Sequence, residues 1–342
     1  MDHTTEHQYP KASTNQMKKS VLIVGTGYIG SHIAKVLKTN GYTPVLIDKK
    51  PFNFEMFEDF YQMDLPKDIH LLDDIVKRYN IDSCICTAGY TSVSESVRNP
   101  QKYYKNNVAM TLQLINKLNN LNVKKFIFSS SAAAYGLPTT GICKDDDVNL
   151  NPINPYGRTK LMVEQLLHDY HVAENFKSIS LRFFNVAGAD PDCELGEDYS
   201  EQTHIIPLAI QAGFTAKQFK LFGNDYNTPD GTCIRDYIHV MDVANAHLNA
   251  LQKIQNDIDY DSFNIASGNG LSNNEILQEV QKHTGAMDIV SSPKREGDPD
   301  TLVADISRSQ NILGWKPTQS GIDNIVRTAV QWYKHLHKKE IN

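Results

Sequence analysis

The sequence predicts an α/β fold, in which a doubly wound parallel sheet carries a smaller, interleaved C-terminal lobe. Three observations lead to this prediction. From residue 20 onward short apolar runs alternate with longer helical stretches, the runs are apolar throughout, and a glycine-rich turn follows the first run directly. Alternation of strands and helices is typical of parallel sheets with crossover helices. Continuously apolar strands indicate a sheet that is covered on both faces.

The elements of this sheet are expected in the first half of the chain. We expect helices from about residue 28, over 71–79 and after Pro100. Each of them follows one strand and precedes another, so each is expected to cross over a face of the sheet. The predicted strands are 21–24, 44–48, 60–64, 84–87 and 125–129.

After Asn185 the chain becomes rich in glycine, aspartate and proline, which is typical of connections that face a ligand. We therefore expect a first lobe over 20–185 and a smaller one over 186–342. The segment 236–240 reads as a strand leading into a helix capped near Asp242, so the chain is expected to return to the first lobe over about 235–248. The polar residues 1–19 are expected to form a disordered tail.

Composition excludes several classes of function. The net charge of -6 over 342 residues leaves no basic surface for a phosphate backbone, so we expect no nucleic-acid partner. No apolar run has the length of a transmembrane helix or the form of a signal peptide, which predicts a cytoplasmic protein without membrane contact. Five irregularly spaced cysteines predict neither a disulfide framework nor a metal site.

The glycine-rich turn contains Gly25, Gly27 and Gly30 and opens a helix. In this setting backbone amides and the positive end of the helix approach a pyrophosphate, as in Rossmann-type dinucleotide sites. Asp48 ends the second strand, where a carboxylate accepts hydrogen bonds from the adenosine ribose and repels a 2'-phosphate. The pattern therefore favours NAD over NADP, although two lysines follow Asp48 directly. A tight turn with a capping aspartate is the structural alternative.

Tyr156 and Lys160 stand four residues apart at the start of a predicted helix, a spacing that also fits an ordinary solvated face. Ser131 follows the strand 125–129, at the edge of the sheet where ligands bind. For a tyrosine to act as a base near neutral pH, its pKa must fall by about 3 units, or roughly 4 kcal/mol. A neighbouring ammonium and a cationic nicotinamide supply this. Tyr156 would then remove a hydroxyl proton while Ser131 bonds that oxygen and Lys160 tunes Tyr156.

The glycine turn and the ordered set of Ser131, Tyr156 and Lys160 resemble the extended short-chain dehydrogenase/reductase family, over nearly all residues from 20 onward. The resemblance to the UDP-galactose 4-epimerases of that family implies interconversion of UDP-galactose and UDP-glucose through a transient 4-keto sugar, with NAD as the hydride shuttle. The strings that carry it are FIFSSSAAAYG (126–136), NPYGRTKLMVEQ (154–165), LRFFNVAGADPD (181–192), FGNDYNTPDGTCIRDYIHVMDVA (222–244) and KREGDP (294–299).

The resemblance also implies which residues contact the NAD cofactor and the UDP-sugar. Ser131 and Tyr156 would face the sugar. The pyrophosphate would be held by Asn185, Arg235 and Arg295, the uracil would lie against Phe222, and the uridine ribose would bond Asp298, although surface arginines paired with aspartates are the plainer alternative. The implied cofactor contacts are Gly25, Gly27, Tyr28, Ile29, Gly30, Asp48, Asp64, Leu65, Thr87, Ala88, Gly89, Asn106, Tyr156, Lys160 and Phe184.

Two positions indicate the branch of the family. Ala132 and Ala133 stand where dehydratases carry an acidic pair and nucleotide-sugar decarboxylases a glutamate, which favours plain epimerisation. Leu302 stands where sugar-restricted members carry a tyrosine, which extends the expected substrates to UDP-N-acetylhexosamines.

Three departures from the family pattern concern the cofactor. Val24 replaces the usual first glycine of the turn, Thr91 replaces a lysine that reaches the cofactor phosphates, and the stretch 48–64 is short. They predict a weaker hold on NAD.

Two alternatives remain open: a 4-epimerase of a UDP-pentose or UDP-uronic acid, and a non-catalytic NAD-binding regulator on the same fold. Retention of Ser131, Tyr156 and Lys160 argues against the regulator. The resemblance further implies a homodimer, formed through the helices after Pro100 and around Tyr156.

Overall fold

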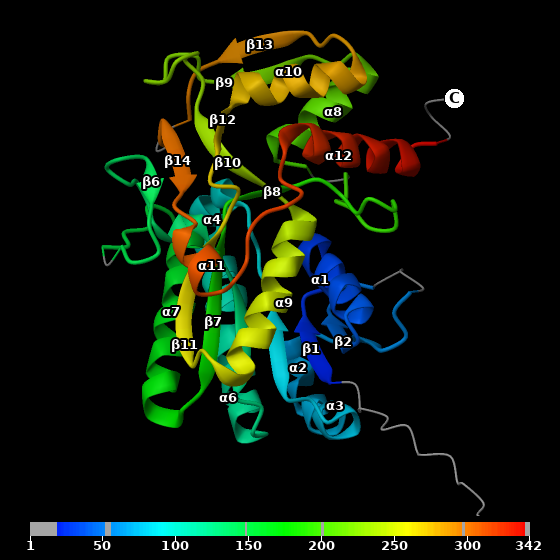
Figure 1. The fold of residues 1–342 in the computed structure, drawn as a ribbon, viewed down its shortest axis with the longest axis vertical. Coiled ribbons are helices and arrows are strands. Elements are labelled where there is room, and N and C mark those ends of the chain that lie inside the picture. The colour runs from blue at the N-terminus through cyan, green and yellow to red at the C-terminus, as the bar shows by residue number, and fades with distance from the viewer. Residues whose placement is uncertain (1–18, 52–55, 148, 200–201, 296–297, 339–342) are drawn as a thin grey trace, which may run out of the picture.

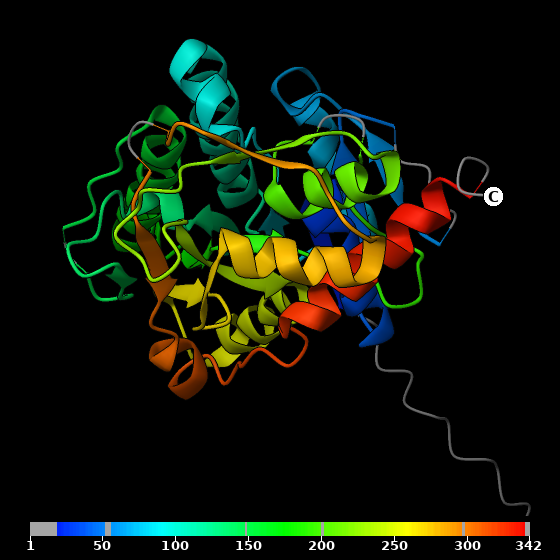
Figure 2. The same cartoon turned by 90° about the horizontal axis from the view of Figure 1, so that it is seen from above.

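In the computed structural model of the chain, residues 19–51, 56–147, 149–199, 202–295 and 298–338 are described. The tail expected at 1–19 falls outside these residues, apart from Lys19. The larger lobe is a sheet with helices on both faces, and the smaller lobe lies across one end of it (Figure 1). Figure 2, seen from above, shows the yellow-orange α10 (Asn273–Thr284) and the red α12 (Ile322–Leu336) of the smaller lobe crossing over the larger one.

The centre of the larger lobe is a parallel sheet of seven strands, which confirms the predicted doubly wound architecture. Chain order reverses between β1 and β4, and this reversal makes a crevice for ligands at the carboxyl ends of the strands. In spatial order the strands are β3 (Phe60–Gln62), β2 (Thr43–Asp48), β1 (Ser20–Val24), β4 (Ser83–Cys86), β5 (Lys125–Ser131), β7 (Lys177–Phe183) and β11 (Tyr260–Ile265).

Both faces of this sheet are buried, as the continuous apolar strands predict. Along β1, Val21 and Ile23 face the cluster that contains α1 (Tyr28–Thr39) and α9 (Val240–Asn256), while Leu22 and Val24 face the opposite cluster. Successive residues of a strand point to opposite faces, so each of these apolar pairs packs against the helices on a different face of the sheet. The opposite face is covered by α3 (Leu72–Tyr79), α6 (Met110–Asn120) and α7 (Pro155–Glu174).

Short helical segments join these elements. The long helix predicted after Pro100 is interrupted by a π-helical stretch, Tyr104–Ala109. The remaining segments are α2 (Leu65–Asp68), the 3-10 turns Ile69–Leu71 and Ala132–Ala134, α4 (Val93–Arg98) and α5 (Pro100–Tyr103).

The smaller lobe has its own sheets and helices. One sheet runs in the order β12 (Gly270–Ser272), β10 (Ile234–His239), β14 (Thr301–Ala304) and β6 (Ile142–Cys143), with β8 (Asn185–Ala187) also paired to β10. A second sheet joins β13 (Ile289–Ser292) to β9 (Phe219–Phe222). The helices of this lobe are α8 (Ile205–Thr215), α10 and α12, which share one apolar cluster with its strands. The short helix α11 (Ser307–Asn311) lies against β11 of the larger lobe.

The chain returns to the larger lobe later than the sequence indicated. The strand predicted at 236–240 is β10, which pairs with strands of the smaller lobe instead of the large sheet. The elements that return are α9, which packs on β5, β7 and α1, and β11, which pairs with β7.

The helix cap predicted near Asp242 was wrong. His239 caps α9, and its Nδ1 accepts the Met241 amide N–H at 3.1 Å. Asp242 is buried and accepts hydrogen bonds from the backbone and side chains of residues 318–320. Its carboxylate therefore anchors a distant loop, a use that a local pattern does not reveal.

None of the helices in the described ranges is long and apolar enough to cross a membrane.

The core packing predicts a stability difference between two positions of the larger lobe. Phe126 is 0% exposed and its ring centroid lies 6.0 Å from that of Phe176. Phe126→Ala should lower the free energy of unfolding by about 3–5 kcal/mol, because it leaves a cavity between β5 and its covering helices. Leu71→Ala, at a residue 42% exposed, should lower that free energy by about 1 kcal/mol or less. Urea unfolding measures both, and equal losses would contradict this account of the core.

Candidate active site

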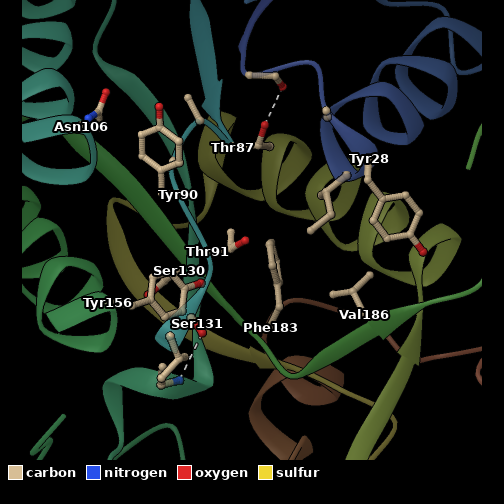
Figure 3. Close-up of a pocket in the computed structure, with 18 of the residues that line it drawn as sticks. Tyr28, Thr87, Tyr90, Thr91, Asn106, Ser130, Ser131, Tyr156, Phe183 and Val186 are labelled. Carbon is tan, nitrogen blue, oxygen red and sulfur yellow. Dashed lines mark hydrogen bonds between the residues drawn. The ribbon is translucent and has the colours of Figure 1, made fainter. Parts of the chain in front are cut away.

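A cavity of about 1040 Å³ lies where the two lobes meet, at the carboxyl ends of β1 and β4. The larger lobe contributes the glycine turn and the ends of β2, β4 and β5. The smaller lobe contributes Asn185, Arg235, Asp298 and Leu302. Figure 3 shows Tyr156 close to Ser130 and Ser131, while Tyr28 lies on the far side of the cavity. The cavity thus joins the two regions that the sequence singled out separately.

The glycine turn packs directly against the start of α1. A Cβ atom at Gly30 would lie 1.9 Å from the carbonyl oxygen of Gly25, so the turn accepts no larger residue there. No side chain caps α1 at Gly27, and the first two residues of the helix, Tyr28 and Ile29, line the cavity. Uncapped amides at a helix start are suited to a phosphate group.

Asp48 is oriented by backbone donors. Its Oδ2 accepts the Thr26 amide N–H at 2.7 Å, and its Oδ1 accepts the Lys50 amide N–H at 2.9 Å. The carboxylate also lines the cavity, and each oxygen can accept a further hydrogen bond from a ribose hydroxyl. Together with the uncapped helix, this arrangement fits a dinucleotide.

Val24, which replaces a glycine of the family pattern, does not disturb the turn. It is the last residue of β1, and its carbonyl accepts the amide N–H groups of Thr87 and Ala88 at 2.9 and 3.0 Å. The turn therefore begins at Gly25, whose own N–H donates to the carbonyl of Ile47 at 2.8 Å.

The first turn of α7 places Tyr156 beside Ser131. Pro155 starts the helix and the Asn154 side chain caps it by accepting the Gly157 amide N–H at 2.8 Å. A Cβ atom at Gly157 would lie 2.3 Å from the carbonyl oxygen of Ala133. Glycine therefore lets the helix touch the turn that follows Ser131, and the two side chains meet.

The Tyr156 hydroxyl is held in its protonated form by its surroundings. Burial raises the pKa of Tyr156, and a hydrogen bond with Ser131 opposes that rise. The ring packs against Tyr103, with centroids 6.5 Å apart in an edge-on arrangement. A positive charge nearby is needed before the hydroxyl can act as a base near neutral pH.

Lys160 lies behind Tyr156 and does not line the cavity itself. Its Nζ donates to the carbonyl of Ser129 at 2.7 Å and lies 5.9 Å from the centroid of the Tyr156 ring. Burial lowers the pKa of Lys160 to about 8, against the opposing fields of Cys86 and Glu164. The ammonium is therefore charged below about pH 8 and loses its charge as the pH rises through that value.

The residues predicted for the nucleotide part of a substrate fall into two groups. Arg235 donates to the carbonyls of Ile234 and Pro299 at 2.9 and 2.8 Å, and its Nη2 lies 3.8 Å from Asp298. Phe222 and Arg295 are outside the cavity lining and lie against each other, with the guanidinium 4.4 Å from the ring centroid. This cation–π contact occupies the face that would otherwise meet a base.

Most of the predicted site residues line one cavity, although the polar atoms of several are already hydrogen-bonded to other parts of the protein. The Tyr28 hydroxyl donates to the carbonyl of Gly188 at 2.6 Å, and the Asn106 amide donates to that of Lys102 at 2.7 Å. Those that line the cavity are Gly25, Gly27, Tyr28, Ile29, Gly30, Asp48, Asp64, Leu65, Thr87, Ala88, Gly89, Asn106, Ser131, Tyr156, Phe184, Asn185, Arg235 and Asp298.

Sequence reasoning missed other lining residues. Glu197 and His204 come from the loop before α8 and share a hydrogen bond of 3.1 Å, which raises the pKa of His204. No motif surrounds them, so the sequence held no signal for them. Lys49 donates to the Tyr90 hydroxyl at 2.7 Å, and both residues line the cavity. In the sequence, the only feature that pointed to Lys49 and Tyr90 was their position directly after Asp48 and Gly89.

Comparison with known proteins agrees with this geometry. The NAD dependent epimerase/dehydratase family matches residues 21–266. The chain belongs to this family. The matched stretch includes the glycine turn, Asp48 and all three of Ser131, Tyr156 and Lys160.

Individual relatives of the family resemble nearly the whole chain. The UDP-glucose 4-epimerase of Lactobacillus helveticus is 41% identical over 323 residues, which are 92% of this chain and 97% of that protein. A crystal structure of UDP-glucose 4-epimerase from Brucella ovis in complex with NAD has a TM-score of 0.87 at 39% identity, covering 92% of this chain and 98% of that one. The UDP-Glc/GlcNAc 4-epimerase of Campylobacter jejuni has a TM-score of 0.80 at 36% identity, covering 93% and 99%.

The glycine turn yields a prediction that separates folding from cofactor binding. Gly30→Ala should weaken NAD binding by roughly tenfold or more, about 1.4 kcal/mol, because the added Cβ displaces the turn. A Cβ at Gly27 meets nothing within 4 Å, so Gly27→Ala should change the free energy of unfolding by no more than about 1 kcal/mol. Gly27→Ala should still weaken NAD binding, since its methyl group faces the cavity. Calorimetry and thermal unfolding measure the two quantities, and wild-type NAD affinity in Gly30→Ala would contradict the assigned turn.

Proposed function

We propose that the chain interconverts UDP-galactose and UDP-glucose, a reaction of galactose metabolism, with NAD as cofactor and the cavity between the lobes as active site. The observation that carries this proposal is that one cavity is lined both by the glycine turn and by Tyr156 and Ser131. The relatives from Lactobacillus helveticus and Brucella ovis, both UDP-glucose 4-epimerases, support it.

Each catalytic side chain has one role in this proposal. Tyr156 removes the proton from the 4-hydroxyl of the sugar and later returns it, Ser131 bonds the same oxygen, and Lys160 stabilises the tyrosinate. NAD, when bound, supplies a carrier that accepts the hydride of carbon 4 and gives it back to the other face of the 4-keto sugar. The glycine turn and Asp48 would hold it. The reaction leaves no net change in oxidation state.

The charge of Lys160 sets the alkaline limit of this chemistry. Below about pH 8 the ammonium is charged and would favour the tyrosinate form of Tyr156. As the pH rises through that value, Lys160 becomes neutral and the tyrosinate loses its support. Turnover should therefore decline on the alkaline side.

The nucleotide would be anchored on the side of the smaller lobe. We assign the pyrophosphate to Asn185 and Arg235 and the uridine ribose to Asp298, all of which line the cavity. Because the nucleotide is anchored away from the reacting carbon, the 4-keto sugar stays bound while it rotates to present its other face. The assignment of Phe222 and Arg295 to the uracil and the pyrophosphate stays a prediction, because neither lines the cavity.

The range of sugars is proposed to include UDP-N-acetylhexosamines. Leu302 lines the cavity and leaves more room than a tyrosine would. The relative from Campylobacter jejuni is a UDP-Glc/GlcNAc 4-epimerase, which agrees with this breadth. UDP-xylose and UDP-glucuronate are the alternative substrates to compare.

We also propose a homodimer that pairs α6 and α7 with the same helices of a second copy. The side chains of Met162 and Val172 on α7 are 40% and 70% exposed, which leaves apolar surface for a partner. Light scattering should give twice the mass of the 38.5 kDa chain. The mass of a single chain in solution would contradict the proposal.

The central prediction concerns turnover of UDP-galactose by the purified protein without added cofactor. UDP-glucose should appear with no accumulation of NADH. Tyr156→Phe should lower kcat by about 10²–10⁴-fold, because it removes the base and leaves the ring. Tyr170→Phe is the matched control on the same helix, since its hydroxyl meets Asn116 at the surface, and it should keep wild-type activity.

If no product forms without added cofactor, there are two explanations, and adding NAD to the same assay distinguishes them. Product that forms only after NAD is added supports the reaction and shows weak retention of the cofactor. No product from UDP-galactose even with NAD contradicts the proposal, and turnover of UDP-xylose or UDP-glucuronate instead would identify the replacement.

A further inference from the structure

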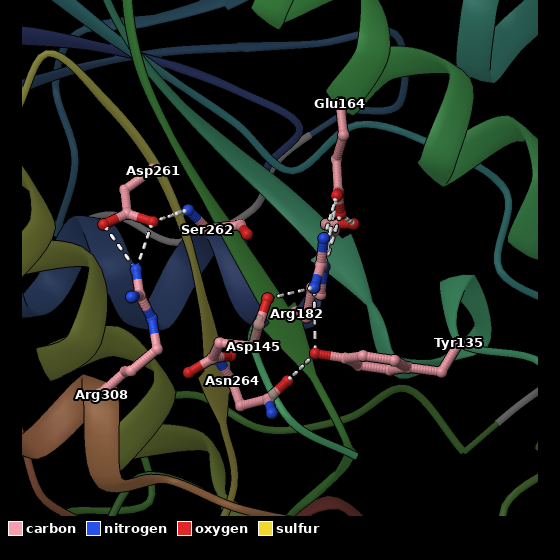
Figure 4. Close-up of polar contacts among 9 residues, drawn as sticks. Tyr135, Asp145, Glu164, Arg182, Asp261, Ser262, Asn264 and Arg308 are labelled. Carbon is pink, nitrogen blue, oxygen red and sulfur yellow. Dashed lines mark hydrogen bonds and ion pairs between the residues drawn. The ribbon is translucent and has the colours of Figure 1, made fainter. Parts of the chain in front are cut away.

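A buried ion pair lies directly behind the catalytic residues. The guanidinium of Arg182 on β7 holds the carboxylate of Glu164 on α7 through contacts of 2.7, 3.1 and 3.2 Å. The two side chains are only 5% and 6% exposed. Figure 4 shows Arg182 between Glu164 and Tyr135. Such a pair adds little stability compared with apolar residues of the same size, so its presence calls for another reason.

Glu164 touches both segments that carry the catalytic groups. It follows Lys160 by four residues, so the two lie on the same face of α7. Its Oε1 accepts the hydroxyl of Ser130, the residue that directly precedes Ser131. One carboxylate therefore ties the helix of Tyr156 and Lys160 to the strand end that presents Ser131.

Arg182 extends the connection to the rest of the site. Its Nη1 donates to the Tyr135 hydroxyl at 3.0 Å and lies 3.4 Å from the carbonyl of Asp145. The Tyr135 hydroxyl donates in turn to Asn264 on β11 at 2.8 Å. Tyr135 belongs to the turn that follows Ser131, so both sides of that serine are fixed to one guanidinium–carboxylate pair.

Glu164 of this pair also acts on the ammonium of Lys160. The groups that face its ammonium are the Ser129 carbonyl and the Phe128 ring on β5, the Cys86 thiol on β4, and Tyr156 and Glu164 on α7, with Arg182 of β7 behind Glu164. Among these groups Glu164 is the carboxylate. Burial lowers the pKa of Lys160 to about 8, and Glu164 opposes that fall.

We propose that Glu164 is a positioning residue for the epimerase reaction, which together with Arg182 fixes Ser131 and Lys160 around Tyr156 and keeps Lys160 charged. This inference rests on the proposed function for its kinetic part. In this role Glu164 does not contact substrate or cofactor, because its carboxylate accepts hydrogen bonds from Ser130 and Arg182.

Two single variants should move Lys160 in opposite directions. Glu164→Gln leaves the cation of Arg182 facing Lys160, so the pKa of Lys160 should fall. Arg182→Met leaves the Glu164 carboxylate without its cation, so the pKa of Lys160 should rise. Each shift should be on the order of one pH unit. If Glu164 and Arg182 had a purely structural role, both variants would lose activity, but the pKa of Lys160 would not move in opposite directions in the two variants.

The experiment measures the pKa of Lys160 and the alkaline limb of kcat/KM against pH. Isotope-labelled lysine gives the pKa by NMR titration, with the Lys160 signal assigned by its loss in Lys160→Met. We expect the NMR pKa and the alkaline limb to move down in Glu164→Gln and up in Arg182→Met. The inference is overturned if neither variant shifts, or if both shift in the same direction.

Arg308→Met is the matched control. Arg308 also pairs with a carboxylate in this region of the larger lobe (Figure 4), where its Nη2 donates to both oxygens of Asp261 at 2.7 and 2.8 Å. Its loss should lower the thermal unfolding temperature but leave the pKa of Lys160 and the alkaline limb unchanged. A shift as large as that of Glu164→Gln would overturn the inference.

Two further arms keep the test decisive. If neither single variant folds, Ser130→Ala removes only the hydroxyl that donates to Glu164, so the negative charge of that carboxylate is less compensated and acts more strongly on Lys160. The pKa of Lys160 should then rise, and an unchanged value overturns the inference. If the wild-type protein turns over no UDP-sugar, the proposed function fails, while the NMR titration still decides whether Glu164 and Arg182 control Lys160.

Discussion

The close contact between the first turn of α7 and the turn after β5 is the constraint on which the site depends. At Gly157 the helix approaches the carbonyl of Ala133 too closely for any side chain. This contact converts two separate sequence signals, a serine at a strand end and a tyrosine at a helix start, into one hydrogen-bonded pair. Everything behind the pair, including the buried Lys160 and Glu164, follows from the direction in which α7 then runs along the sheet.

The smaller lobe is held to that same edge by backbone pairing. β8 leaves the large sheet directly after β7 and pairs with β10, in register from Asn185 opposite Tyr237. α9 then returns to the larger lobe, where His247 lies 3.2 Å from the hydroxyl of Ser129. Ser129 thus meets α9 through its side chain and Lys160 of α7 through its carbonyl, so helices on both faces of the sheet bear on the position of the ammonium.

Much of the larger lobe could be predicted because its signals are local. The apolar strands, the glycine turn and Asp48 are each legible within a few residues, and the sheet edge brings them together. The pairing of β10, the anchoring role of Asp242 and the contact between Phe222 and Arg295 depend on residues far apart in the chain, and short patterns carry no such information. Glu197 and His204 reach the cavity from an irregular loop without a periodic signal, so no sequence pattern indicated that they line it.

The interleaving of the lobes limits how such a protein can be recombined. A chain that ended near residue 185 would lack β11, which pairs with β7, and α9, which covers one face of the sheet. The remaining fragment would expose an edge strand and an apolar layer, which favours aggregation. Chimaeras between relatives must therefore exchange β11 and α9 together with the first lobe, so the sugar-binding part cannot be grafted as one continuous cassette.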